Sequence, residues 1–117
     1  MGKPVTHWEI NTKDATKLQK FYADLFDWKI DTNNPMNYGM VNTGGKGGIN
    51  GGIGLGEKFF GVTFYVEVDD LQEYLTTAEK MGGRTLVPPT TIPGSVSFAL
   101  FADPEGNRIG LVKAGSM

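Results

Sequence analysis

The sequence predicts an α+β fold built from two βαβββ modules, and three observations support this prediction. Short runs with the alternation of half-buried strands are interrupted twice by apolar residues at helical spacing. The order of elements in the first half recurs in the second half. Residues 7–14 and 63–70 correspond, and each segment ends in Asp. We therefore expect one domain of 117 residues, with module one at about 4–56 and module two at about 60–114.

Module one begins with a predicted strand over Val5–Thr12, where polar and apolar residues alternate. Thr12 or Asp14 can cap the following helix, which we expect to end near Asp27. The helix has one apolar face, formed by Ala15, Leu18, Phe21, Tyr22, Leu25 and Phe26. Three strands follow, over 28–31, 38–42 and 49–55. The last is rich in glycine, which indicates a bulge or the close approach of another group to its backbone.

Module two repeats this plan. A strand over Gly61–Val68 leads to Asp69-Asp70, which caps a second helix that Gly82-Gly83 ends. We expect Pro88-Pro89 to break the next strand, because proline cannot donate to a strand ladder. The turn Asp103-Pro104-Glu105-Gly106 then joins the last two strands, since these residues favour tight turns. The three closing strands are predicted over 85–87, 96–101 and 108–112.

Each module has one helix to cover one face of its sheet, so the other face stays free. Two such curved mixed sheets can surround a cleft, with the helices on the outside. Strand alternation places six side chains on the polar faces that would line this cleft. These candidate ligand-binding residues are His7, Glu9, Asn11, Thr63, Tyr65 and Glu67.

Composition excludes several classes of function. The net charge is −2 and the charges are interspersed, so a nucleic-acid partner is not expected. No apolar run approaches the roughly 20 residues that span a bilayer, and no segment resembles a signal peptide. The absence of cysteine excludes disulfides and thiolate chemistry. We expect a cytoplasmic protein that does not associate with membranes.

The chain resembles the vicinal oxygen chelate superfamily, the glyoxalase, bleomycin-resistance and dioxygenase group, and its small single-domain members of unassigned function above all. The motifs that carry this resemblance span nearly the whole chain. They are Val5-Thr6-His7-Trp8-Glu9-Ile10, Lys20-Phe21-Tyr22-Ala23-Asp24-Leu25-Phe26-Asp27-Trp28, Gly48-Ile49-Asn50-Gly51-Gly52, Val68-Asp69-Asp70-Leu71 and Asp103-Pro104-Glu105-Gly106-Asn107. The resemblance implies paired βαβββ modules, a cup-shaped cavity and a homodimer.

The resemblance also implies where metal ligands would stand. Metalloenzymes of this superfamily take four His or Glu ligands from the first and last strands of each module. The first position falls on His7 and matches. The second falls near Gly51 or Gly52, the third on Thr63 and the fourth on Gly110. Only one of the four can bind a metal as the family does, so we expect no metal and no other cofactor.

Two functions remain open at this point. The first is a protein that binds a small molecule in a dimer cleft without metal, as the resistance proteins do. The second is a lyase, isomerase or dioxygenase of the glyoxalase type, in which His7 joins non-standard ligands such as Glu9 and Glu67, or a cavity glutamate acts as a base. His7 is the only histidine, and a hydrogen-bonded cavity residue is the simpler interpretation of it. The first function is the one we favour.

Overall fold

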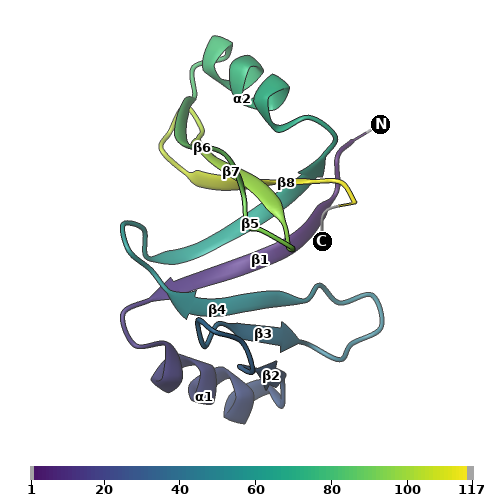
Figure 1. Cartoon of the computed structure of the whole chain (residues 1–117), viewed down its shortest axis with the longest axis vertical. Coiled ribbons are helices and arrows are strands. Elements are labelled where there is room, and N and C mark those ends of the chain that lie inside the picture. Colours follow the sequence, from purple (N-terminus) through teal and green to yellow (C-terminus); the bar gives the residue numbers. More distant parts are fainter. Residues whose placement is uncertain (1, 116–117) are drawn as a thin grey trace. The chain divides into compact units, whose positions relative to one another are not determined.

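A computed structural model describes residues 2–115. It contains two helices and eight strands, and it confirms the α+β class (Figure 1). The elements are β1 (Val5–Thr12), α1 (Ala15–Phe26), β2 (Lys29–Asp31), β3 (Gly39–Asn42), β4 (Gly51–Leu55), β5 (Gly61–Val68), α2 (Leu71–Lys80), β6 (Arg84–Thr91), β7 (Ser97–Ala102) and β8 (Arg108–Lys113). They fall into two compact units. The first unit is residues 6–63, and the second comprises the described residues up to Val5 and from Phe64 onward.

The strands of the first unit lie in the order β2-β3-β4-β1. The β4–β1 pair is parallel and the others are antiparallel. Trp8 lies opposite Gly51 and Ile10 lies opposite Ile53 in this parallel pair. Helix α1 packs on β2 and β4. Its N-cap is Asp14, whose carboxylate accepts a hydrogen bond from the Lys17 amide at 3.1 Å.

The buried side of α1 differs from the predicted apolar face. Its buried residue is Gln19, whose Nε2 donates to the Ile53 carbonyl oxygen at 2.8 Å. Phe21, Leu25 and Phe26 are 55%, 58% and 53% exposed. Half of the six residues of the apolar face are therefore largely exposed. The sheet beneath α1 presents backbone carbonyls and glycines, which suit the amide side chain of Gln19. With Gln19 on the buried side of the helix, part of the apolar face is left at the surface.

The second unit repeats the topology with a different interior. Its strands follow the order β5-β8-β7-β6, in which only the β5–β8 pair is parallel. The Asp70 carboxylate caps α2 by accepting from the Glu73 amide at 3.1 Å, and α2 packs on β6, β7 and β8. The core of this unit is aliphatic and consists of Val68, Leu71, Leu75, Ala99 and Leu111.

Strand β6 continues beyond the point where the sequence predicts a break. It runs through Pro88-Pro89 to Thr91, so that prediction is wrong. The strand lies at the end of the order in its unit, and the pairing with β7 shifts register between Val87 and Thr90. Proline is tolerated in such an edge strand because its missing N–H needs no partner on the open side.

The turn between β7 and β8 forms as predicted. The Asp103 carboxylate accepts hydrogen bonds from the amides of Glu105 and Asn107 and from the Asn107 side chain, each at 2.8–2.9 Å. Hydrogen bonds from Asn107 lower the pKa of the Asp103 carboxyl below its ordinary value. The turn therefore closes the hairpin by local bonds alone.

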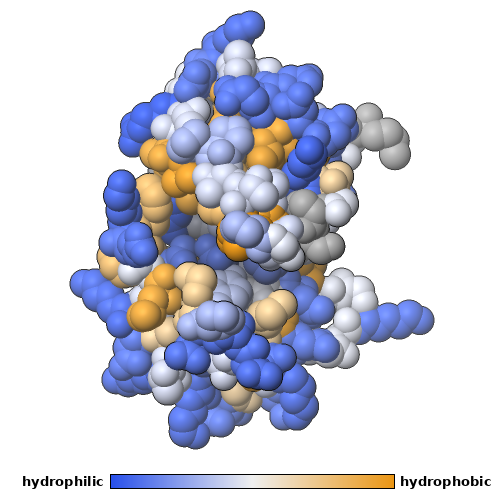
Figure 2. Space-filling model, viewed as in Figure 1, coloured by the Kyte–Doolittle hydropathy of each residue, from blue (hydrophilic) through white to orange (hydrophobic). Residues whose placement is uncertain are grey.

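Neither α1 nor α2 is long and apolar enough to cross a membrane, among the residues the structure describes. Large apolar side chains do reach the surface. Figure 2 shows hydrophobic residues exposed among the hydrophilic ones. Besides those on α1, the large apolar residues that are exposed include Met36, Leu55, Phe60 and Val62.

Candidate functional site

Strand β1 carries three of the predicted binding residues. His7, Glu9 and Asn11 are alternate residues of one strand, and all three are half-buried. The Glu9 carboxylate accepts a hydrogen bond from the Tyr38 hydroxyl at 2.8 Å and another from Asn11 Nδ2 at 3.2 Å. The Glu9 side chain is thereby held in place from two sides, which is what a positioned carboxylate requires.

His7 is close enough to Glu9 for their charges to interact. Burial lowers the pKa of the His7 imidazole below its ordinary value of 6.5, and the negative charge of Glu9 opposes this shift. Desolvation is the larger effect. Burial thus favours the neutral imidazole, which can both donate and accept a hydrogen bond.

The glycines of β4 make room for aromatic rings. A Cβ added at Gly52 would overlap the Tyr38 hydroxyl, and one at Gly54 would press on the same ring. A Cβ at Gly51 would overlap the indole of Trp8. The predicted close approach to this backbone is thus confirmed, and the approaching groups are side chains of β1 and of the residue before β3. Glycine is required here by space.

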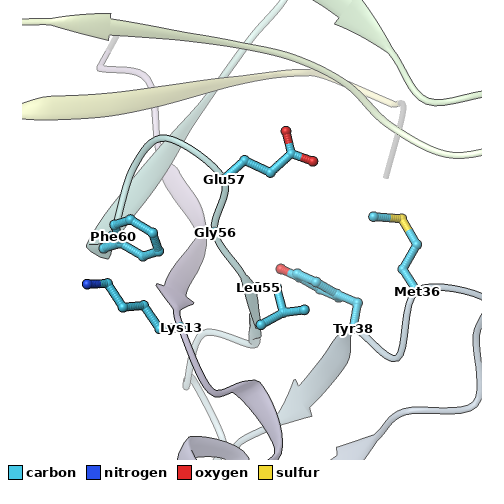
Figure 3. Close-up of a pocket in the computed structure, with 7 residues that line it drawn as sticks. All are labelled: Lys13, Met36, Tyr38, Leu55, Gly56, Glu57 and Phe60. Atoms are coloured by element: carbon cyan, nitrogen blue, oxygen red, sulfur yellow. The ribbon is translucent and has the colours of Figure 1, made fainter.

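A pocket of about 450 Å³ opens beside the glycines of β4, within the first unit (Figure 3). The ring of Tyr38 forms part of its wall while the hydroxyl of the same residue contacts Glu9. The residues labelled in Figure 3 come from the segment between β1 and α1, from the segment before β3, and from the end of β4 onward. The lining residues are Lys13, Met36, Tyr38, Leu55, Gly56, Glu57 and Phe60.

Sequence reasoning did not assign most of this pocket. Tyr38, Lys13 and Glu57 are not among the binding residues that strand alternation predicts. One signal was available for Tyr38, because an aromatic residue on a strand next to glycines commonly covers them. No comparable pattern marks Lys13 and Glu57, which are separated by 44 positions in the chain.

The remaining predicted residues lie on β5. Thr63 is buried, with 2% of its surface exposed, and it ends the first unit. Tyr65 is also buried, and its ring covers Gly110 so closely that a Cβ there would overlap it. Glu67 is half-buried, and Tyr65 and Glu67 both belong to the second unit. His7, Glu9 and Asn11 are thus adjacent in one unit, and Tyr65 and Glu67 lie in the other.

Two units of βαβββ order, each with one helix packed on its strands, place the chain in the α+β class. The chain belongs to the Glyoxalase/Bleomycin resistance protein/Dioxygenase superfamily, whose model matches residues 5–111. The resemblance in the sequence is thereby confirmed.

Individual relatives agree with this assignment. A glyoxylase-like domain-containing protein of Didymella fabae is 32% identical over 108 residues, which cover 85% of this chain and 84% of that protein. A superfamily member from Vibrio splendidus 12B01 shares the fold with a TM-score of 0.66 at 13% identity, over 96% and 99% of the two chains. The methylmalonyl-CoA epimerase of Mycobacterium tuberculosis does so with a TM-score of 0.60 at 16% identity, over 93% and 86%.

The metal that this superfamily implies does not fit the side chains found here. Among residues 2–115, no three His, Cys, Asp or Glu side chains gather closely enough to share an ion. The expected second position lies near Gly51 or Gly52, where the rings of Trp8 and Tyr38 fill the space that a ligand side chain would need. The expected fourth position is Gly110, where the ring of Tyr65 does the same. Aromatic rings thus occupy the space of a ligand side chain at each of these glycines.

Proposed function

We propose that this protein binds a small organic molecule in the pocket of its first unit, without the divalent metal of its superfamily. The observation that carries the proposal is the Tyr38 ring, which packs on Gly52 and Gly54, forms a pocket wall and holds Glu9 through its hydroxyl. The Tyr38 ring thereby occupies space that a metal-ligand side chain would need and presents an aromatic surface to the pocket.

The lining of the pocket supports this proposal. Its volume of about 450 Å³ lies in the range of ligand sites, which is roughly 300–1,000 Å³. Met36, Leu55 and Phe60 supply exposed apolar surface, while Lys13 and Glu57 supply charge. Apolar walls with a few charged groups are typical of sites that bind organic molecules. His7, Asn11, Thr63, Tyr65 and Glu67 remain proposed binding residues of the same protein.

A thermal-shift screen tests the proposal. A ligand at 100 times its dissociation constant stabilises the folded protein by about 2.7 kcal/mol, which raises the melting temperature by several degrees. Met36→Trp, which fills the pocket, should abolish the shift. Met81→Trp, at a residue that is 74% exposed in the second unit, should not. A shift that survives Met36→Trp would place the ligand elsewhere.

Elemental analysis tests the part of the proposal that excludes a divalent metal. The protein is incubated with zinc, nickel, manganese and iron salts and then freed of excess metal. We expect no stoichiometric metal. One bound ion per chain, lost in His7→Ala, would overturn this part of the proposal, because His7 is the one family ligand position that matches.

The alternative is an enzyme in which Glu9 acts as a base. It is favoured by the hydrogen bonds that Tyr38 and Asn11 donate to Glu9, and by the fold shared with an epimerase, a class that moves protons at carbon. Deuterium exchange at the acidic carbon of methylmalonyl-CoA tests it. Exchange that disappears in Glu9→Gln would favour the enzyme over the binding protein.

We also propose that the protein is a homodimer, as the family resemblance implies, and that it is cytoplasmic, as its composition suggests. The exposed apolar side chains of Phe21, Leu25 and Phe26 on α1 support association with a second copy, since such surfaces mark interfaces. Sedimentation at micromolar concentration should give a dimer. A monomer under these conditions would contradict the proposal.

A further inference from the structure

The pocket of the first unit contains a cation that no carboxylate neutralises. Lys13 precedes the N-cap of α1, and its ammonium lies 5.4 Å from the centre of the Phe60 ring. Ion pairs among the described residues join Lys20 to Asp24 and Lys29 to Asp27, and neither involves Lys13. The contact with Phe60 holds the ammonium at the pocket wall, because a cation is attracted to a ring face.

The same pocket contains an anion on another side. Glu57 lines it from the turn after β4, and in Figure 3 its carboxylate points away from Lys13 and Phe60, toward the side of Tyr38 and Met36. No ion pair or hydrogen bond joins the Glu57 side chain to another described residue. A positive and a negative side chain therefore line one pocket without forming an ion pair with each other.

Apolar surface separates these two charges. Leu55 is 66% exposed and Met36 is 80% exposed, and the rings of Tyr38 and Phe60 complete the wall. A molecule lying against this wall would place its two ends near charges of opposite sign. A ligand with a single anionic group would gain from Lys13 and lose at Glu57, and a purely cationic one would do the reverse.

We infer that the ligand is an elongated aromatic molecule with an anionic group at one end and a cationic group at the other. The anionic group pairs with Lys13, the aromatic body lies against Leu55, Met36 and the two rings, and the cationic group pairs with Glu57. This inference rests on the proposed binding function and narrows its ligand to a dipolar aromatic class.

Matched probes test the inference. They are 4-(aminomethyl)benzoate, 4-methylbenzoate and 4-methylbenzylamine, together with their biphenyl counterparts of greater length. These share one body and differ in charge. Each exposed ion pair contributes up to about 1 kcal/mol, so each charged end should tighten binding roughly fivefold. In calorimetry at low salt, the dipolar probe should bind at least severalfold more tightly than either singly charged probe.

Charge reversal provides the decisive variants. Lys13→Glu and Glu57→Lys should each weaken the dipolar probe roughly tenfold or more, because one end then meets a like charge. The double variant Lys13→Glu/Glu57→Lys should restore binding, since the probe can turn end over end. Lys58→Glu changes the net charge as Lys13→Glu does, but its side chain does not line the pocket, so binding should stay unchanged. All three positions are exposed, and circular dichroism checks that each variant folds.

The outcomes separate this inference from the proposed function. Equal binding of the three probes, all lost in Met36→Trp, would overturn the dipolar ligand and retain the binding pocket. Tighter binding of a singly charged probe would overturn it in the same way. A failure of the double variant to recover, with both single variants weakened, would also overturn it. If none of the probes binds, the inference is overturned. If the wider screen also finds no ligand, the proposed function is overturned as well.

Discussion

The two units share the order βαβββ but have different interiors. The second unit buries aliphatic side chains from α2, β5, β7 and β8. The first unit packs tryptophan and tyrosine rings on glycines and buries Gln19 under α1. Both tryptophans of the chain lie in the first unit, and their rings are 5.3 Å apart. The same topology thus supports a mostly aliphatic core in one copy and an interior rich in aromatic rings, with a pocket beside it, in the other.

This difference indicates a division of roles. An aliphatic core is dense and stabilises its unit through burial of apolar surface. A wall of rings on glycines leaves rigid aromatic faces beside open space, which suits a ligand. We therefore expect substitutions in the second unit to act on stability and substitutions in the first to act on binding.

The largest effect is expected in the core of the second unit. Leu75 is 1% exposed and packs within the aliphatic cluster, so Leu75→Ala should lower the free energy of unfolding by about 2–5 kcal/mol. Met81→Ala, at an exposed residue just beyond α2, should change it by less than about 0.5 kcal/mol. Urea titration followed by circular dichroism measures both. Equal effects would contradict the packing described for α2.

The next effect compares the two glycine positions. Gly52→Ala and Gly110→Ala each force a methyl group into a tyrosine ring, so each should destabilise the protein by about 1–3 kcal/mol. Only Gly52→Ala should also weaken ligand binding, because it displaces Tyr38. Gly45→Ala is the control, since a Cβ there meets nothing within 4 Å.

A double variant tests the physical cause of that effect. Gly52→Ala combined with Tyr38→Ala should cost less than the sum of the two single substitutions, because the added methyl group no longer meets the ring. Additive costs would mean that the ring is not what excludes a side chain at Gly52.

A smaller effect follows from the hydroxyl of Tyr38. Tyr38→Phe keeps the ring on its glycines and removes the 2.8 Å hydrogen bond to Glu9, which should cost about 1 kcal/mol. Tyr22→Phe, whose ring stacks on Trp28, should cost less than about 0.5 kcal/mol. Tryptophan fluorescence is the suitable measurement, because Trp8 and Trp28 both report on the first unit. Equal costs would show that the Tyr38–Glu9 bond contributes no stability.

The sequence predicts the elements well because their signals are local. Alternation identifies β1 and β5, Asp14 and Asp70 cap the helices, and Asp103 closes its turn with bonds to residues within four positions. The errors have non-local causes. Pro88-Pro89 is tolerated because β6 is an edge strand, and α1 is rotated toward Gln19 because of the carbonyl of Ile53 beneath it.

The pocket shows the same limit more clearly. The glycines of β4 correctly indicated a close approach to the backbone, but the approaching ring of Tyr38 is known only once β3 pairs with β4. Lys13 and Glu57 line one pocket only once the segment before α1 and the segment after β4 are placed. Periodicity describes one element at a time, so it cannot show which side chains of different elements share a cavity.

The smallest predicted effect is a pH dependence confined to the first unit, which contains the only histidine. Burial lowers the pKa of His7 below 6.5, so the unfolded chain binds a proton more readily than the folded one. The corresponding stability is fully present above about pH 6.5 and is lost as the pH falls through the folded-state pKa of His7.

His7→Gln should therefore lose less stability than the parent protein between pH 7.5 and 5.5, measured by urea titration with tryptophan fluorescence. Groups that do not interact with His7 contribute equally in both proteins and cancel in the difference. A greater loss in His7→Gln would mean that Glu9, rather than burial, dominates the environment of the imidazole.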